Sequence, residues 1–339
     1  MGLLKDMATG RPILSHDDGL TVYNDPMTRM TRREFVAGAL AVPAVSMAAD
    51  AFPIVDTHTH FYDPFRPQGV PWPPKENKLL YRAVLPDEYR RITRPLGVRA
   101  TIEIEASAWL EDNQWVLDLA DQNPVLIGSV GDLEPGKPGF ARNLERFHKN
   151  PMFLGIRLGI LWGRNLFDDI SNPQYIQDLT LLAEAGLQVD AVGQGNVAIF
   201  PTLVRMTDRI PDLRVVIDHM PFDPPQGEKQ RAVYESSLRE LGQRPSVYSK
   251  VSNVLRRVDG RVPEEVDFYR PSLDYLWETF GQDRLIYGSN WPVSERFAPY
   301  PVVLKVVREY FTGKGATASE RYFWRNSKVA YRWKEIRDS

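Results

Sequence analysis

Short apolar runs rich in β-branched residues alternate with longer amphipathic segments from residue 54 to near the C-terminus. Apolar residues within the short runs indicate buried strands, and spacings of three and four in the longer segments indicate helices. Ile54 begins the first predicted strand. The other seven predicted strands are residues 100–106, 125–130, 153–159, 187–192, 214–220, 247–253 and 284–290. The predicted helices between them are residues 113–122, 139–149, 174–185, 198–209, 229–241, 271–280 and 302–311.

This alternation predicts an α/β fold with a parallel sheet, because parallel strands need crossover connections and helices usually provide them. Eight such units predict one (β/α)8 TIM barrel. A doubly wound open sheet is the alternative. No Gly-x-Gly-x-x-Gly follows a predicted strand, so the sequence does not favour dinucleotide binding. A last helix over residues 319–333 is expected to close the bottom or side of the barrel.

The N-terminal segment has a different pattern. Arg32 and Arg33 precede an uncharged, Ala- and Val-rich run over residues 36–49, followed by small residues. This is typical of an export signal, and the arginine pair with Phe35 resembles a twin-arginine signal. The alternative is an amphipathic helix, but the run lacks a polar face.

We therefore expect residues 1–51 to be an N-terminal extension with a twin-arginine export signal, and residues 52–339 to be the barrel domain. The mature protein is expected in the periplasm, with the export machinery as a partner. The apolar run is short for a membrane span, so no stable membrane insertion is expected after processing. The true start codon stays open between Met1, Met27 and Met30.

Composition excludes several function classes. The chain has 339 residues and a formal charge of −2, so it has no bulk attraction for nucleic acid or anionic membranes. It contains no cysteine, which excludes disulfides, thiolate nucleophiles and Cys-ligated metals. The partner expected for the mature domain is a small-molecule substrate.

The segment IVDTHTHFYDP, residues 54–64, carries the most informative chemistry. On a regular strand Asp56, His58 and His60 occupy alternate positions and would share one face. Two imidazoles so placed can hold one ion or one substrate, whereas the alternative is a chance pair of surface histidines. The Pro- and aromatic-rich loop that follows, with Trp72, is predicted to cover this end of the fold as a lid.

This segment resembles the first-strand His-x-His of the amidohydrolase superfamily, in the branch of sugar-lactone hydrolases and pyrone-dicarboxylate lactonase. Four further segments resemble that branch in chain order. They are Gly155-Ile156-Arg157, Ile217-Asp218-His219-Met220-Pro221, Lys250-Val251-Ser252 and Gly288-Ser289-Asn290-Trp291-Pro292. The last departs from the family pattern, because Asn290 stands where the family usually has aspartate.

The resemblance implies catalytic roles for His58, His60, His219 and Asn290. The three histidines would hold one divalent metal ion, with zinc the expected metal, or would polarise the substrate carbonyl directly without a metal. An amide is no base near neutral pH, so Asn290 is expected to orient water. The general base stays open between Glu105, Asp190 and a histidine.

Substrate-binding roles are expected for Arg157, Lys250, Glu105 and Trp291. Arg157 and Lys250 would bind a substrate carboxylate or stabilise an oxyanion. The alternative for Arg157 is a structural ion pair with Glu103 or Glu105. The alternation along the strand turns Asp218 away from the site, which predicts a structural role for it.

The function expected from these residues is hydrolysis of a lactone, either of a sugar acid or of an aromatic-catabolism intermediate. One alternative is other chemistry of the superfamily, such as amide hydrolysis or decarboxylation. The other is a vestigial binding protein, with catalysis impaired by Asn290.

Overall fold

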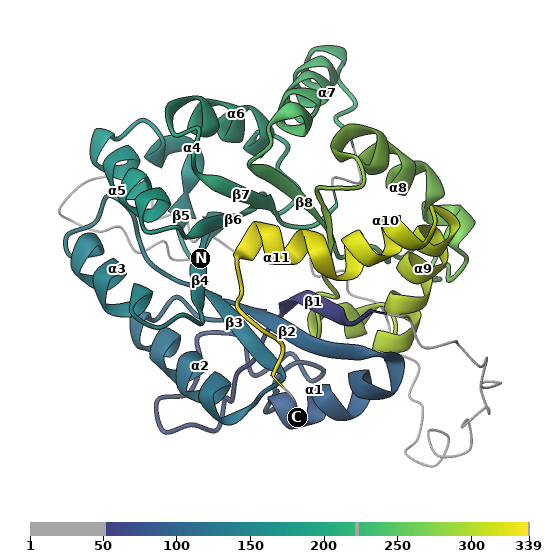
Figure 1. Ribbon diagram of the computed structural model, residues 1–339, viewed down its shortest axis with the longest axis horizontal. Helices are drawn as coiled ribbons and strands as arrows, with labels where there is room; N and C mark the ends of the chain where they lie inside the picture. Colours follow the sequence, from purple (N-terminus) through teal and green to yellow (C-terminus); the bar gives the residue numbers. More distant parts are fainter. Residues whose placement is uncertain (1–51, 221–223, 338–339) are drawn as a thin grey trace, which may run out of the picture. The chain divides into compact units, whose positions relative to one another are not determined.

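A computed structural model describes residues 52–220 and 224–337 of the chain. Eight parallel strands form one sheet in the order β1-β2-β3-β4-β6-β7-β8-β9, and helices surround it (Figure 1). The strands are β1 (Ile54–Thr59), β2 (Val98–Ile104), β3 (Leu126–Gly131), β4 (Phe153–Leu161), β6 (Gln188–Val192), β7 (Arg214–Ile217), β8 (Val247–Val251) and β9 (Leu285–Tyr287). The short β5 (Arg164–Asn165) pairs antiparallel with β4. The predicted (β/α)8 barrel is confirmed.

The first and last barrel strands close the ring through residues that also belong to the motifs. Thr59 forms a parallel bridge with Trp291. The amide of Asn290 donates to His58 O at 2.9 Å, and the amide of His60 donates to Trp291 O at 2.9 Å. Closure removes the open edges of the sheet and brings residues 58–60 beside residues 290–291.

The main helices lie between the strands, as the periodicity predicts. They are α1 (Pro86–Thr93), α2 (Leu110–Gln122), α3 (Phe140–His148), α4 (Leu166–Asp169), α5 (Pro173–Glu184), α6 (Ile199–Arg209), α7 (Glu228–Gln243), α8 (Val266–Phe280) and α9 (Tyr300–Gly313). The sequence pattern missed α1 and α4. Both are short, with few positions over which a period can be recognised.

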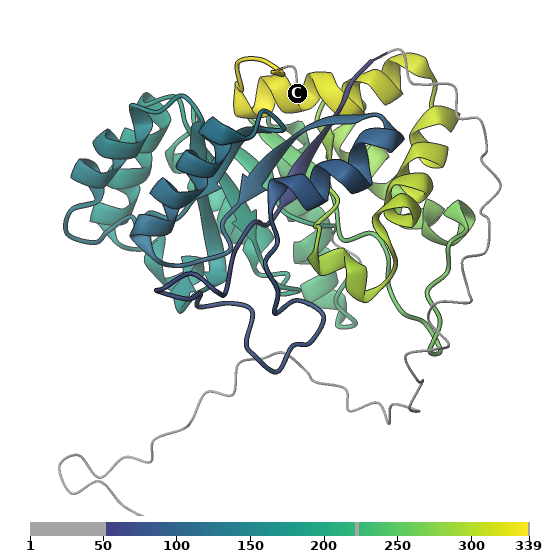
Figure 2. The same cartoon turned by 90° about the horizontal axis from the view of Figure 1, so that it is seen from below.

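The C-terminal segment covers the end of the barrel where the strands begin. It was predicted as one helix, but it consists of α10 (Ala316–Glu320), a π-helical turn (Arg321–Arg325) and α11 (Asn326–Tyr331). Tyr331 and Trp333 pack with the apolar residues inside the barrel, including Val55 and Ile286. Figure 2 shows α11 on one side of the barrel and the loop between β1 and α1 on the opposite side.

Several predicted strands extend too far at their C-terminal ends. Strand β7 ends at Ile217, β8 at Val251 and β9 at Tyr287. The excluded residues include His219, Asn253 and Asn290, whose φ angles are 67°, 53° and 60°. A positive φ ends extended backbone, so the chain turns at the polar residues that follow each strand. In TIM barrels the C-terminal strand ends form the active site.

In the part of the chain that is described, no helix is long and apolar enough to cross a membrane. The predicted export signal lies outside the described residues.

Candidate active site

Lys250 forms the centre of a buried charge cluster inside the barrel. Its ammonium donates to Asp190 Oδ2 at 2.6 Å and to Asp218 Oδ1 at 2.8 Å, and it lies 3.2 Å from His58 Nδ1. The side chains of Lys250, Asp190 and Asp218 have no solvent-exposed surface. Tyr331 donates to Asp190 from the C-terminal segment. The partners of Lys250 in the structure are thus two protein carboxylates.

This arrangement favours one proton position on His58. An ammonium has three N–H donors and no acceptor, and the three groups around Lys250 are two carboxylates and His58 Nδ1. When all three protons are used, Nδ1 of His58 carries the lone pair and the ring proton lies on Nε2. Asp218 Oδ1 also lies 3.3 Å from Nδ1, so in the other tautomer Nδ1 would donate to this oxygen and the lone pair would lie on Nε2. The Nε2 atom is buried and has no hydrogen-bond partner among the described residues.

A missing side chain makes the close contact of His58 and Lys250 possible. Gly288 follows β9 and lies between them. A Cβ atom at this position would lie 2.8 Å from His58 Cβ and 3.0 Å from Lys250 Cδ. Glycine therefore lets three strands approach closely.

Asp218 was predicted to face away from the site, and this prediction is wrong. It accepts from Lys250 and, at 2.8 Å, from Arg157 Nε. Strand β7 has ended before Asp218, and His219 then turns the chain with a φ of 67°. Strict alternation therefore no longer applies, and Asp218 and His219 both contact site residues.

Asp56 was predicted to share a face with His58 and His60, and this prediction is also wrong. Its carboxylate accepts from Tyr89 on α1 and from Tyr300 on α9, each at 3.0 Å, so it faces the helical layer. The pairing of β1 with β2 shifts register between Asp56 and Thr59. Such an irregularity changes which residues share a face.

His60 is held in the opposite tautomer to His58. Its Nδ1 lies 2.8 Å from the carbonyl oxygen of Ile104. Because a carbonyl oxygen only accepts, Nδ1 carries the proton and Nε2 carries the lone pair. Asn290 Oδ1 lies 3.3 Å from this Nε2. With the amide flipped, its NH2 group would face the ring and could donate there.

His219 completes a group of three imidazoles. Its ring centroid lies 4.6 Å from that of His58, and His58 and His60 are 5.0 Å apart. The Nδ1 atom of His219 is 2.8 Å from Ser252 Oγ, just after β8. The ring centroid of Trp72 lies 6.0 Å from that of His60. The β1–α1 loop therefore covers the side of the site at His60, as the lid prediction expects.

Burial keeps these imidazoles neutral at neutral pH. Loss of solvent lowers the pKa of His60 to about 4 and that of His219 to about 3. Burial also lowers the pKa of His58 well below its usual value, against the opposing charge of Asp218. Burial alone would raise the pKa of Asp218, but Lys250, His58 and Arg157 together hold it well below its usual range. The site thus combines neutral rings with an ionised carboxylate.

A cavity of about 270 Å³ reaches the imidazoles through His219. It is lined by the loop after β6 and by the ends of β7 and β8, together with the start of α6. Its polar lining side chains include Gln194 and Asn253. This volume lies near the lower end of the range for small-molecule sites, about 300–1,000 Å³.

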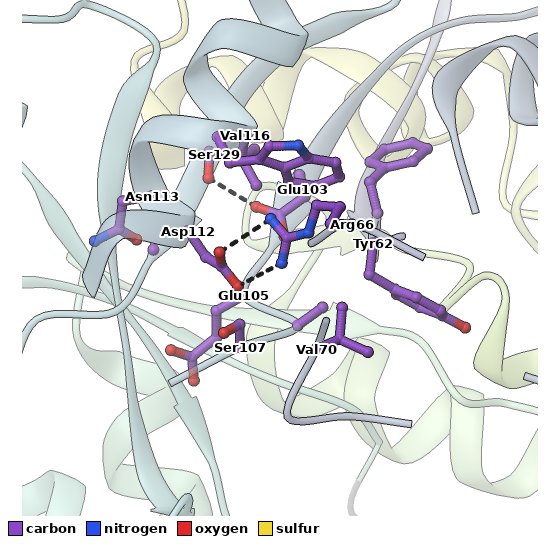
Figure 3. A pocket seen from close by; sticks show the side chains of 14 residues that line it. Tyr62, Arg66, Val70, Glu103, Glu105, Ser107, Asp112, Asn113, Val116 and Ser129 are labelled. Atoms are coloured by element: carbon purple, nitrogen blue, oxygen red, sulfur yellow. Dashed lines mark hydrogen bonds and ion pairs between the residues drawn. The ribbon is translucent and has the colours of Figure 1, made fainter. Parts of the chain in front are cut away.

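A second, much smaller pocket lies under the β1–α1 loop. Its volume is about 20 Å³, which is room for roughly one water molecule. Figure 3 shows Arg66 bonded to Asp112 and Glu103 bonded to Ser129 around this pocket. Burial raises the pKa of Glu103 and of Glu105 to about 8. Glu105, expected to bind substrate, lines this pocket and contacts Arg164.

The other expected substrate-binding residues are also engaged within the protein. Arg157 pairs with Asp218, not with Glu103 or Glu105 as the alternative interpretation had it. Trp291 is fully buried against Phe61 and Tyr89, and its Nε1 donates to Glu295 at 2.8 Å. Trp291 thus packs between the barrel and the helices and lines neither pocket.

The expected metal centre does not fit these side chains as they are placed. Within residues 52–220 and 224–337, no group of three or more His, Asp or Glu side chains is placed to hold a metal ion. A metal at His58 Nε2 needs the ring lone pair there. That requires the tautomer whose Nδ1 proton faces Asp218 and not the one that accepts from Lys250.

The amidohydrolase family model matches residues 55–333. The chain belongs to this family. Two curated relatives of this amidohydrolase are L-fucono-1,5-lactonases. The Burkholderia ambifaria enzyme is 27% identical over 244 residues, covering 71% of this chain and 80% of the relative. The Burkholderia multivorans enzyme is 24% identical over 288 residues, covering 80% and 92%.

Solved structures share this fold. An amidohydrolase from Burkholderia multivorans with bound zinc superimposes with a TM-score of 0.72 at 20% identity, covering 83% of this chain and 99% of the other. A Pseudomonas putida protein, provisionally described as a 2-pyrone-4,6-dicarboxylic acid hydrolase, has a TM-score of 0.66 at 25% identity, covering 84% and 99%. A manganese-bound 5-carboxyvanillate decarboxylase from Novosphingobium aromaticivorans shares the fold, with a TM-score of 0.59 at 15% identity over 84% and 97%.

Sequence reasoning missed three contributors to this amidohydrolase site. They are Asp218, Asn253 and Tyr331. Asp218 was assigned to the wrong face. Asn253 was placed at the end of a strand, without a role. Tyr331 comes from a C-terminal helix to which no role in the site was given. For Asp218 and Asn253 the sequence did offer a signal, since each is a polar residue just past the end of a strand.

Proposed function

We propose that this protein hydrolyses a lactone by adding water to the ring carbonyl. The observation that carries the proposal is the pair of fixed and opposite tautomers at His58 and His60. One ring presents an N–H donor and the other presents a lone pair, and their centroids are 5.0 Å apart. Such a pair can polarise a carbonyl and accept a proton from water in the same step.

In this mechanism His58 donates its Nε2–H to the lactone carbonyl oxygen. His60 Nε2 accepts a proton from water, and the water oxygen bonds to the carbonyl carbon. The negative charge that develops on the carbonyl oxygen is stabilised by the His58 donor. When the tetrahedral intermediate collapses, the ring C–O bond breaks and the leaving oxygen takes the proton from His60. The product is an open-chain hydroxy acid.

Lys250 and Asp218 act as positioning residues, because they contact His58 and have no exposed surface. Asn290 lies beside His60 and is suited to orient the attacking water. His219 lies between His58 and the larger cavity, where it can contact the bound ring. The proposal thus assigns the base, left open by the sequence, to His60.

The relatives support a lactone as substrate. Both curated relatives named above are sugar-acid lactonases, and the Pseudomonas putida protein is named for a pyrone ring. The decarboxylase shares the fold at an identity too low to carry an argument about activity.

A zinc ion on His58, His60 and His219 stays a separate prediction. Bound there, it would supply an activated water near neutral pH. The present side-chain placement does not favour it, since His58 would first have to move its Nε2 proton.

Export to the periplasm by the twin-arginine machinery is also proposed, on the pattern of residues 31–51 alone. Fusion of these residues to a reporter that is active only after twin-arginine export tests it, with an Arg32→Lys/Arg33→Lys pair as control.

The decisive experiment is a lactone hydrolysis screen on native protein and on His60→Gln. We expect native turnover and a loss of about 100-fold or more in kcat for the variant. Native protein that binds lactones without turnover would instead support the vestigial binding interpretation. Release of an amine or of CO2 from other substrates would support other superfamily chemistry.

A further inference from the structure

The larger cavity offers no cationic side chain to a ligand. Among the described residues that line it, the only ionisable side chains are Asp218 and His219. The Asp218 carboxylate has no exposed surface and is paired with Lys250 and Arg157, and His219 Nδ1 contacts Ser252 Oγ. A carboxylate placed in this cavity would therefore meet no lysine or arginine among the described lining residues.

The nearest cations are already neutralised. Arg157 donates to Asp218 at 2.8 Å, and Lys250 donates to Asp190 at 2.6 Å and to Asp218 at 2.8 Å. For Lys250, binding a substrate anion would require breaking a buried ion pair, which leaves an uncompensated charge. Arg157 contacts Asp218 through Nε, one of its five N–H donors, but it does not line this cavity. The expected role of Arg157 in holding a substrate carboxylate stays a prediction.

Amide side chains line the cavity, where a site selective for anions would have a lysine or an arginine. Gln194 follows β6 and Asn253 follows β8, and both line the cavity with positive φ angles of 47° and 53°. This left-handed geometry costs energy for a non-glycine residue, so the turns are held by the surrounding structure. An amide offers both a donor and an acceptor, which matches hydroxyl groups.

The remaining wall is apolar. Ile199, Phe200 and Met220 line it and are buried. A sugar ring has C–H faces that pack on such a surface and hydroxyl groups that bond to amides. An anionic aromatic acid lacks the hydroxyl groups and carries a charge that no described residue lining this cavity can pair.

We propose that this cavity selects an uncharged, polyhydroxylated lactone over a lactone that carries a carboxylate, with Gln194 and Asn253 as specificity-determining residues. This inference rests on the proposed lactonase activity. It narrows the substrate to the neutral sugar-lactone class and excludes dicarboxylate pyrones as preferred substrates.

The test uses a matched pair of substrates. An aldono-1,4-lactone and the aldaro-1,4-lactone of the same ring stereochemistry differ only by CH2OH against carboxylate at C6. We expect kcat/KM to be at least about tenfold higher for the neutral lactone, because the cavity lining offers no cation to pair a carboxylate taken out of water. A higher value for the anionic lactone overturns the inference and leaves the proposed activity standing.

A variant that adds a positive charge at position 194 tests whether Gln194 determines substrate specificity. Gln194→Arg should raise kcat/KM for the aldarolactone relative to the aldonolactone by about tenfold, since it supplies the missing cation. Gln243→Arg is the matched control, because Gln243 is exposed at the end of α7, near the opposite rim of the barrel. An unchanged ratio in Gln194→Arg contradicts the assignment of Gln194.

Failure of the chemistry is distinguishable from failure of the selectivity. If neither lactone is hydrolysed, the lactonase proposal fails, and calorimetry with the corresponding neutral and anionic lactams still measures selectivity. Tighter binding of the neutral lactam supports the inference, and equal or weaker binding overturns it.

Discussion

Lys250 Nζ lies 3.2 Å from His58 Nδ1, and this contact favours a proton on Nε2 of His58. The lysine is in turn held by Asp190 on β6 and by Asp218, which follows β7. Buried charges beside His58 thus influence which of its nitrogens carries the proton.

Lys250→Met should remove this control. We expect kcat to fall by about 100-fold and stability to drop by about 3–5 kcal/mol, because two buried carboxylates lose their partner. Activity assays and urea unfolding measure the two effects. Lys305→Met is the control, since Lys305 is half-exposed in an ion pair with Glu309. Near-native kcat in a folded Lys250→Met protein would contradict the positioning role.

Neutral imidazoles should set the acid limit of activity. The pKa of His60 is about 4, so kcat/KM should stay level down to about pH 5 and fall as pH drops through about 4. If kcat/KM instead fell as pH dropped through about 6.5, the base would be a histidine with an unperturbed pKa. A pH–rate profile on protein shown by circular dichroism to stay folded at each pH separates the two.

The free energy of unfolding should also depend on pH through His60, because the pKa of this ring differs between the folded and unfolded states. The folded pKa of His60 lies below its unfolded value, so the unfolded state binds more protons between about pH 4 and 6.5. Stability contributed by this ring is lost as pH falls through that window. His60→Gln should therefore flatten the stability profile between pH 6.5 and 4, as chemical denaturation at each pH would show. An unchanged slope would mean that the ring is not buried neutral.

Asn290→Asp restores the residue that the family pattern has. A carboxylate beside His60 favours its protonated form and raises its pKa, so the acid limb of kcat/KM should move to higher pH. A gain of orders of magnitude in kcat, from a native protein that binds lactone without turnover, would favour the vestigial binding interpretation.

Metal removal tests the tautomer argument directly. If His58 works with its proton on Nε2, as proposed, exhaustive chelation should leave kcat within about twofold of its starting value. Metal content measured before and after chelation confirms that the treatment worked. Loss of activity that one equivalent of zinc restores would establish the three-histidine zinc centre instead.

The sequence by itself determined the barrel and most of the motifs. Apolar runs and amphipathic periods are local properties, so eight strands and the helices between them could be recognised from spacing. His58, His60, His219 and Asn290 were also identified, and the resemblance gave their roles. Each of these follows from residues adjacent in the chain.

Only the tertiary structure decided how those residues are used. The face of Asp56 depends on a register shift against β2, and the face of Asp218 depends on the turn at His219. Proton positions on His58 and His60 depend on Lys250 and the Ile104 carbonyl, which are distant in sequence. Alternation predicts side-chain direction only while a strand stays regular, and the strand ends where this site forms are irregular. Contacts between strands there override the local pattern, and the chemistry depends on those contacts.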